Sequence, residues 1–238
     1  MKKFAVFDID GTLVRWQLYH AMADALAQSG HANPKAYDSM RDTRRAWKRR
    51  SGSTFKDYES QVIDIYESIV KKLSFHEIEQ AIDTVFAEYK DQVYIYSRDL
   101  ITKLKADDYL LFAISGSQSE IVAKIADYYG FDDYVGTVYE RHNTGFTGSK
   151  TIGSQNKDTT LRAMVHKHRA SFKDSVGIGD SHSDISMLEL VERPIAFNPE
   201  KNLFDYAQSR GWKVIVERKD MIYELEDKDG KYQLATPN

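Results

Sequence analysis

Apolar runs and helical periodicities alternate along this chain, and together they predict its elements. Residues 4–13 read FAVFDIDGTL, an apolar run that meets a glycine, which is typical of a buried strand in a parallel sheet. The runs at 109–114 and 175–179 have the same character. Shorter strand patterns follow at 134–140, 194–197 and 213–216. Because helical segments separate these strands, we expect βαβ units and a mainly parallel α/β sheet.

Between residues 15 and 93 the pattern is helical, with almost no strand signal. Apolar residues recur at spacings of three and four, as one face of a helix requires. One such set is Val62, Ile65, Ile69 and Leu73. Breaks are expected at 30–34, at 51–54 and at Ser74, where Ser74 and Glu77 have capping-box spacing. We therefore expect a cap of about four helices at residues 15–94, inserted into a core of residues 1–14 and 95–238.

The second half of the chain predicts further elements between its strands. Helices are expected at 99–106, 120–129, 157–168, 183–191 and 203–210. Glycines punctuate residues 142–148, which we expect to form a turn region. Alternation between residues 221 and 234 predicts a C-terminal hairpin.

Composition narrows the class of protein. The chain has 238 residues, 42% hydrophobic and 29% charged, which is ordinary for a globular protein. It has no apolar run of membrane-spanning length and no apolar segment of signal-peptide type, so we expect a cytoplasmic protein without membrane partners. The absence of cysteine excludes disulfides and thiolate chemistry. A net charge of −3 provides no basic field for nucleic acid, so none is expected as a partner.

Polar residues gather where the apolar strands end. Asp8 and Asp10 close the first strand, Ser115 and Gly116 follow the second, and Asp180 follows the third. Carboxyl ends of parallel strands converge on one crevice, where open α/β sheets bind ligands. Two carboxylates one residue apart repel each other unless a cation or an exchanging proton lies between them. These positions are therefore candidates for one phosphate or metal site.

Each of these residues also has an ordinary explanation. Asp8 and Asp10 could form a solvated turn, and Ser115 with Gly116 could be a helix-entry turn. Lys157 alone would be a surface lysine, and Asp184 could simply favour the first turn of a helix. Their order along the chain and their placement at strand ends favour the functional interpretation of the whole set.

That order resembles the four motifs of the haloacid dehalogenase superfamily. The matching residues are DIDGTL at 8–13, Ser115, Lys157, and GDSHSD at 179–184. The resemblance covers residues 4–199. The helical insertion after the first motif, GTVYERHNTGFTG before the lysine and IAFNPE after the fourth motif look like the phosphoserine phosphatase branch. The resemblance implies a Rossmann-like core with a helical cap.

The resemblance also implies the chemistry of the carboxylates. Asp8 would attack phosphorus and form an aspartyl-phosphate, and Asp10 would exchange a proton with the leaving oxygen and later with water. Mg²⁺ would be the cofactor, because it prefers carboxylates and phosphate oxygens as ligands. Its ligands would be the side chains of Asp8 and Asp180 and the backbone carbonyl of Asp10. Asp184 would hold this metal shell from outside.

The remaining motif residues would bind the phosphoryl group. The Ser115 hydroxyl and the Gly116 amide would contact its oxygens at a helix N-terminus. Lys157 would balance charge on Asp8 and on the phosphate. His182 lies within the fourth motif, but a hard Mg²⁺ site prefers oxygen ligands, so we expect no direct role for its imidazole.

The substrate is expected to be a small phosphorylated metabolite other than phosphoserine. Where phosphoserine phosphatases have a glutamate that binds the substrate ammonium, this chain has Gln17, which we take as a substrate-binding candidate without that charge. No arginine follows Phe55 at the position that would bind a carboxylate, and Ser183 replaces an asparagine. We therefore predict a neutral or anionic phosphoester as substrate.

The basic run at 41–50, RDTRRAWKRR, has six basic residues in ten. It could bind a second anionic group, or a nucleotide that stacks on Trp47. It could also be a solvated helix face balanced by acidic residues of the cap, and we favour this second interpretation.

We therefore expect a Mg²⁺-dependent phosphatase. A phosphotransferase or mutase that uses the same intermediate is one alternative. A phosphate-binding or regulatory module without turnover is another, although every catalytic position of the motifs is filled.

Overall fold

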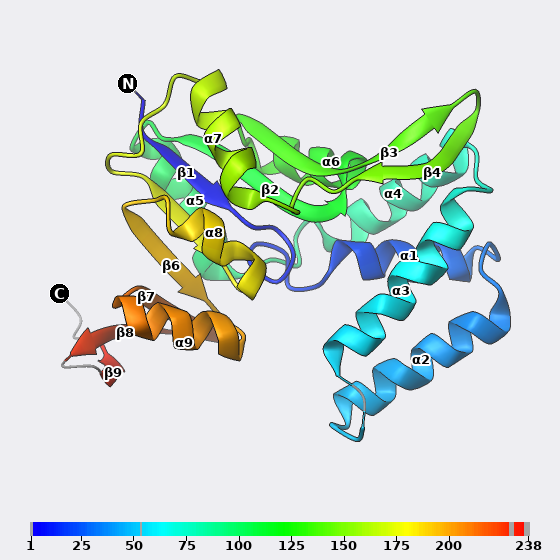
Figure 1. Cartoon of the computed structure of the whole chain (residues 1–238), viewed down its shortest axis with the longest axis horizontal. Coiled ribbons are helices and arrows are strands. Elements are labelled where there is room, and N and C mark those ends of the chain that lie inside the picture. The colour runs from blue at the N-terminus through cyan, green and yellow to red at the C-terminus, as the bar shows by residue number, and fades with distance from the viewer. Residues whose placement is uncertain (1, 53, 229–230, 236–238) are drawn as a thin grey trace. The chain divides into compact units, whose positions relative to one another are not determined.

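The computed structural model describes residues 2–52, 54–228 and 231–235 (Figure 1). Its strands are β1 (Phe4–Phe7), β2 (Leu110–Gln118), β3 (Asp133–His142), β4 (Gly145–Thr151), β5 (Val176–Gly179), β6 (Arg193–Phe197), β7 (Lys213–Arg218), β8 (Met221–Lys228) and β9 (Lys231–Leu234). Its helices are α1 (Leu18–Gln28), α2 (Pro34–Lys48), α3 (Phe55–Val70), α4 (Phe75–Tyr89), α5 (Ile95–Ala106), α6 (Ser119–Tyr129), α7 (Lys157–Lys167), the 3₁₀ helix η1 (His182–Asp184), α8 (Ile185–Leu188) and α9 (Lys201–Arg210).

The sheet has the strand order β4-β3-β2-β1-β5-β6-β7-β8-β9. β1 pairs in parallel with β2 on one side and with β5 on the other. The chain builds outward from β1 through β2 and β3, then returns to the other side for β5, β6 and β7. The direction of winding therefore reverses between β1 and β5, and ligands of open α/β sheets bind beside such a reversal. The predicted α/β class with a mainly parallel sheet is confirmed.

The chain divides into two compact units. The core unit contains Met1–Arg15, Lys90–Thr137 and Ile152–Asn238, and the cap unit contains Trp16–Tyr89 and Val138–Thr151. The cap unit thus ends its helical part a few residues before the expected boundary at 94. It also includes residues 138–142 of β3 and all of β4, whereas the sequence pattern places these residues in the core.

The cap unit combines α1 to α4 with the β3–β4 hairpin. The four residues of the predicted apolar face are buried, as expected: Val62, Ile65, Ile69 and Leu73. The predicted capping box also forms, because the Ser74 amide and hydroxyl donate to the Glu77 carboxylate while the Glu77 amide donates to the Ser74 hydroxyl. These two features rest on local periodicity and local hydrogen bonds, which the sequence shows directly.

The expected turn region at 142–148 is wrong in part, because these residues form a hairpin. β3 and β4 pair antiparallel, with His142 opposite Gly145 across a tight turn. Asn143, in that turn, has a φ of 48°, a conformation that asparagine tolerates better than most residues. Both glycines of this region, Gly145 and Gly148, therefore lie in the second strand of a hairpin.

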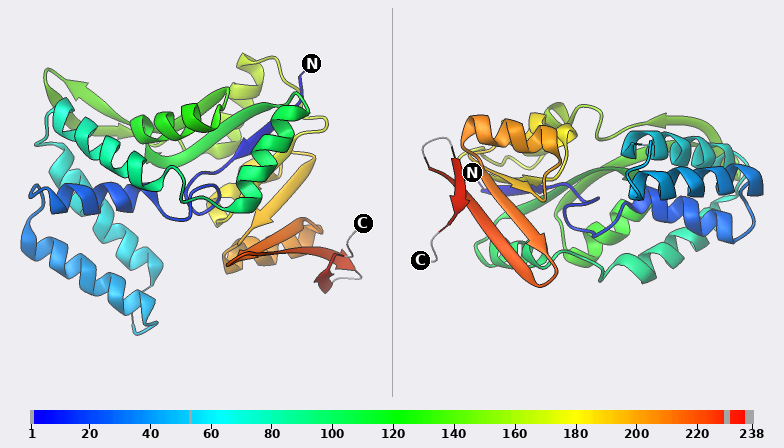
Figure 2. Two further views of the ribbon diagram at one scale, coloured as in Figure 1. Left: turned by 180° about the vertical axis from the view of Figure 1, so that it is seen from behind. Right: turned by 90° about the horizontal axis from the view of Figure 1, so that it is seen from below.

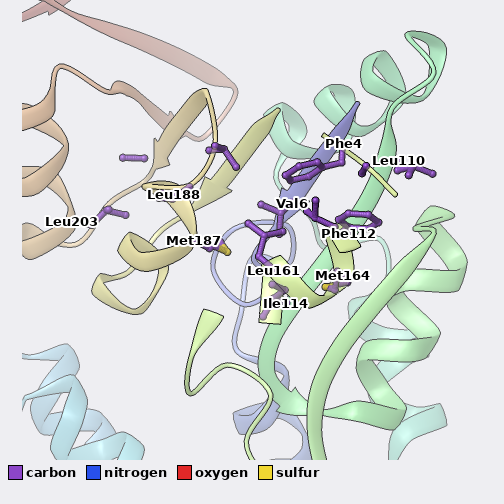
Figure 3. Close-up of a cluster of buried hydrophobic side chains, with 14 of the residues drawn as sticks. Phe4, Val6, Leu110, Phe112, Ile114, Leu161, Met164, Met187, Leu188 and Leu203 are labelled. Carbon is purple, nitrogen blue, oxygen red and sulfur yellow. The ribbon is translucent and has the colours of Figure 1, made fainter. Parts of the chain in front are cut away.

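Alternate residues of the central strands pack on one face of the sheet in the core unit (Figure 3). Phe4 and Val6 of β1 lie beside Phe112 and Ile114 of β2, and α7, α8 and α9 cover them with apolar side chains such as Leu161. Residues between these point to the opposite face. Figures 1 and 2 show α5 and α6 on that opposite face. Burial on both faces explains why these strands are apolar without alternation.

The two strands of the predicted C-terminal hairpin are present and extend the sheet (Figure 2), while the turn at 229–230 lies outside the described residues. β8 pairs antiparallel with β7 and with β9. The Tyr232 hydroxyl donates to the Trp212 carbonyl at 2.6 Å, which ties β9 to the segment before β7. Among the described residues, no helix is long and apolar enough to cross a membrane.

Candidate active site

The first carboxylate of the site stands directly after β1. The Asp8 amide donates to the Ile178 carbonyl of β5 at 3.0 Å, so the strand pairing continues to this residue. The chain then turns sharply, with Gly11 at a φ of 84°, which glycine adopts without steric cost. The Val14 amide closes this turn by donating to the Ile9 carbonyl at 2.9 Å. The turn holds Asp8 and Asp10 at the edge where β1, β2 and β5 end.

Lys157 connects the first and the fourth motif. It is the first residue of α7, and only 2% of its side chain is exposed. Its Nζ lies 2.6 Å from Oδ1 of Asp8 and 2.6 Å from Oδ1 of Asp184, and it also donates to the Ile114 carbonyl at 3.2 Å. A buried ammonium with three acceptors is a satisfied charge, so Lys157 is not a surface lysine.

Asp184 organises the loop after β5. Its Oδ2 accepts hydrogen bonds from the backbone amides of Asp180 and Ser181 at 3.1 and 2.9 Å, while Lys157 donates to its Oδ1. Gly179 makes this approach possible, because a Cβ at that position would lie 2.5 Å from the Asp184 Cγ. The carboxylate is thus enclosed by donors, and it fixes the backbone that carries Asp180.

The three carboxylates at this edge lie close enough to bind one cation. Asp8, Asp180 and Asp184 each offer an oxygen within 4.8 Å of the others. Burial raises the pKa of Asp8 to about 7, against the opposing charge of Lys157. Burial first, and then the charge of Asp8, raise the pKa of Asp180 well above its ordinary value. Oxygen donors with an excess of buried negative charge fit a divalent cation such as Mg²⁺.

The charge of Lys157 does not cancel this excess. Burial alone would lower the pKa of its ammonium, but the charges of Asp184 and Asp8 outweigh burial and raise it. Lys157 therefore stays protonated and supplies one positive charge. Four carboxylates, those of Asp8, Asp10, Asp180 and Asp184, stand at the same edge of the sheet.

Asp10 is held by two serines of β2. Ser115 Oγ donates to Asp10 Oδ2 at 2.5 Å, and Ser117 Oγ donates to Asp10 Oδ1 at 3.0 Å. β2 continues to Gln118, four residues beyond the predicted end of the strand. The expectation that Ser115 and Gly116 lie at a helix N-terminus is therefore wrong, since α6 begins at Ser119 and both residues belong to the strand.

Several hydroxyl groups near the carboxylates were not among the residues predicted from the sequence. Ser117 is the clearest case, because residues i and i+2 of a strand point to the same face. Had the strand been extended past Ile114, Ser115 and Ser117 would have been expected side by side. Thr12 Oγ1 donates to Asp180 Oδ1 at 3.4 Å, and buried Ser97 holds the Thr12 carbonyl at 2.6 Å. The threonine inside the first motif, two residues after Asp10, is the signal for this contact.

Two further candidates, Gln17 and His182, belong to different units of the chain. Gln17 belongs to the cap unit, where it precedes α1 and its side chain does not cap the helix. Its role toward substrate stays a prediction. His182 is exposed, and its backbone amide donates to Glu200 Oε1 at 2.7 Å. The cluster of possible metal ligands contains Asp8, Asp180 and Asp184 and does not include its imidazole.

The basic run of the cap is largely engaged within the cap unit. Arg44 pairs with Asp24 at 2.9 Å and lies over the Trp16 ring at 4.8 Å. Trp47 stacks on Tyr58 with ring centroids 5.7 Å apart. These contacts give the run a structural role inside the cap.

Comparisons with known proteins agree with this geometry. The profile of the haloacid dehalogenase-like hydrolases matches residues 5–189. The chain is 23% identical over 231 residues to the histidinol-phosphatase of Neisseria meningitidis, covering 90% of this chain and 99% of that protein. A Bordetella pertussis Tohama I protein of unknown function has a similar structure, with a TM-score of 0.73, 25% identity, and coverage of 90% of this chain and 98% of that one.

A phosphoserine phosphatase solved as an analogue of its phospho-aspartyl intermediate also shares the fold. The TM-score is 0.62 at 20% identity, and the match covers 92% of this chain and 95% of that one. At this identity the likeness concerns the fold.

Proposed function

Because this chain belongs to the haloacid dehalogenase-like hydrolase family and resembles its phosphoserine phosphatases, we propose that it hydrolyses a small phosphomonoester through a phosphorylated Asp8. One observation carries the proposal. Asp8, Asp10, Ser115 and Lys157 come from different parts of the chain, yet hydrogen bonds pair Lys157 with Asp8 and Ser115 with Asp10 at the carboxyl edge of the sheet, beside a cluster suited to a cation.

The proposed reaction has two displacements at phosphorus. In the first, an oxygen of Asp8 bonds to phosphorus, the bond from phosphorus to the ester oxygen breaks, and the Asp10 carboxyl gives its proton to that oxygen. In the second, a water oxygen attacks phosphorus, its proton passes to Asp10, and Asp8 leaves as a carboxylate with inorganic phosphate as product. Asp10 thus returns to its starting state after each cycle.

Polar groups around Asp8 would orient the phosphoryl group. The Ser115 hydroxyl and the Gly116 amide, at the end of β2, are the donors that we assign to its oxygens. Lys157 holds the carboxylate of Asp8 in place and contributes positive charge to the transition state. The buried edge of the sheet limits the water that could compete for these contacts.

A divalent cation would complete the charge balance. Asp8 and Asp180 would hold it through their side chains and Asp10 through its backbone carbonyl, with Asp184 fixing the loop behind Asp180. Bound Mg²⁺ would neutralise charge on Asp8 and on the phosphate, so that two anions could approach each other.

The proposal is tested by phosphate release from a panel of phosphomonoesters, with acid quenching to trap phosphorylated protein. We expect multiple turnovers and an acid-stable phosphoryl group that mass spectrometry assigns to Asp8. Transfer to an added polyol in place of water would favour the phosphotransferase alternative. Tight phosphate binding without any turnover would favour the regulatory module and reject the enzyme.

Metal dependence is a separate expected result. Chelator should abolish activity, and Mg²⁺ should restore it and raise the midpoint of thermal unfolding, because it offsets the excess of carboxylate charge. Ca²⁺ should also raise the midpoint but inhibit, because it accepts more oxygens and tends to bind a carboxylate through both of them. Full activity in chelator would contradict this prediction.

Substrate preference is expected to exclude phosphoserine. The panel should include phosphoserine, histidinol phosphate, sugar phosphates, polyol phosphates and nucleotides. We expect kcat/KM to be highest for a neutral or anionic ester, since Gln17 has no charge to offset the desolvation of an ammonium group.

A charge variant makes the preference testable within one protein. Gln17→Glu should raise kcat/KM for phosphoserine relative to a polyol phosphate, and Gln17→Asn, which keeps the amide, serves as its control. If the wild-type protein prefers phosphoserine, Gln17 does not set the preference, and the prediction fails.

A further inference from the structure

Ser117 makes a contact that the proposed reaction does not use. The residue is 2% exposed and lies in the last part of β2. Its hydroxyl donates to Asp10 Oδ1 at 3.0 Å, and its amide donates to the hydroxyl of Ser115 at 2.9 Å. Ser117 therefore contacts both the proton-transfer carboxyl and the residue assigned to the phosphoryl group.

The two serines cannot keep equivalent roles once substrate binds. A serine hydroxyl has one proton to donate. In this structure Ser115 donates it to Asp10 Oδ2, whereas the proposed function requires it at a phosphoryl oxygen. When Ser115 turns to the phosphate, Ser117 is the β2 hydroxyl that still holds Asp10, through the opposite oxygen.

We propose that Ser117 is a positioning residue that holds Asp10 through Oδ1 and so keeps the acidic proton on Oδ2, next to the phosphoryl site. This inference rests on the proposed function. An oxygen that accepts a hydrogen bond is a poorer place for the carboxyl's own proton, because that proton would need to find another acceptor around a half-buried side chain. Oδ2, which Ser115 releases, is then the oxygen that carries the proton to the leaving group.

The proposal concerns one proton in the first displacement. As the ester bond of the substrate breaks and Asp8 bonds to phosphorus, the proton moves from Asp10 Oδ2 to the ester oxygen, which leaves as an alcohol. A strongly basic alkoxide needs this proton as it leaves, whereas p-nitrophenolate is stable without it. Loss of Ser117 should therefore slow the two kinds of substrate unequally.

The test compares Ser117→Ala with the wild-type protein on the best alkyl phosphate of the panel and on p-nitrophenyl phosphate. We expect kcat/KM to fall roughly tenfold to a hundredfold for the alkyl phosphate, the size of effect expected for loss of a hydrogen bond to the charged carboxylate that forms as Asp10 gives up its proton. For p-nitrophenyl phosphate it should fall by less than about threefold. kcat/KM is the informative quantity because it reports the first displacement.

Two further variants separate positioning from general damage. Ser117→Thr keeps the hydroxyl and should restore the wild-type ratio of the two substrates, while Ser117→Gly should behave like Ser117→Ala. Ser175→Ala is the matched control, since Ser175 is fully buried and its hydroxyl donates to the Phe172 carbonyl at the other end of β5. It should lower the midpoint of unfolding and leave the substrate ratio unchanged.

The outcomes are distinct. Equal losses on both substrates, or a wild-type ratio in both Ser117→Ala and Ser117→Gly, would overturn the role of Ser117 while the phosphatase stands. If Ser117→Ala does not fold, Ser117→Gly and Ser117→Thr decide the matter by the same ratio. Wild-type protein that hydrolyses neither substrate would instead reject the proposed function.

Discussion

Replacing Asp8 with asparagine is expected to lower kcat by roughly 10⁴-fold or more, because removal of a covalent nucleophile leaves only binding and electrostatic contributions. Asparagine keeps the shape of the side chain and can still accept a hydrogen bond from Lys157, which now lies 2.6 Å from Asp8 Oδ1. The measurement is phosphate release on the best substrate of the panel, together with acid-quench trapping, in which Asp8→Asn should retain no phosphoryl group.

The same variant should not be less stable than the wild-type protein. Burial raises the pKa of Asp8, so the folded state disfavours the charged carboxylate that catalysis needs. Urea unfolding in chelator should give Asp8→Asn an equal or higher free energy of unfolding. Wild-type turnover in Asp8→Asn would reject the phospho-aspartate intermediate.

Asp10→Asn is the companion variant. We expect it to bind substrate but to have severely impaired turnover.

Lys157→Met should damage both activity and stability. The ammonium is 2% exposed and pairs with two buried carboxylates, so its removal leaves Asp8 and Asp184 without a countercharge. Breaking such a buried pair costs about 3–5 kcal/mol, which urea unfolding in chelator should show as a lower free energy of unfolding. Loss of its charge beside the phosphoryl group should lower kcat/KM by roughly a hundredfold to a thousandfold.

Lys201 provides the matched control. Its Nζ also lies 2.6 Å from a carboxylate, that of Asp205, but its side chain is 83% exposed. Exposed pairs contribute at most about 1 kcal/mol, because water screens the charges in the folded and the unfolded state alike. Lys201→Met should therefore leave the free energy of unfolding and kcat/KM nearly unchanged. Comparable losses in both variants would show that burial is not what makes Lys157 important.

Local pattern was enough to predict the main elements. The apolar run at 175–179 appears as β5, and the helical periodicity around Val62 and Ile65 appears as α3. Ser74 and Glu77 form the predicted capping box. These predictions succeeded because a strand buried on both faces, an amphipathic helix and a helix cap each depend on residues close together in the chain.

Elements that depend on a distant partner could not be predicted in this way. β2 runs on through Ser115, Gly116 and Ser117, residues that locally suggest a turn, because β3 lies beside it and Gln118 pairs with Thr137. The hydrogen bonds that extend β2 therefore come from another segment of the chain.

The sequence by itself determined which residue types stand at the strand ends and in which order, and so the family and the candidate residues of the site. Only the tertiary structure decided which of these residues form ion pairs and hydrogen bonds with one another. Lys157 lies between Asp8 and Asp184, which are 149 and 27 positions away from it in the chain, and Ser117 donates to Asp10 from another strand. Burial removes the carboxylates of Asp8 and Asp180 from water and raises the pKa of both. The negative charge gathered there is what a bound cation would offset. Burial of this kind exists only once the sheet has assembled.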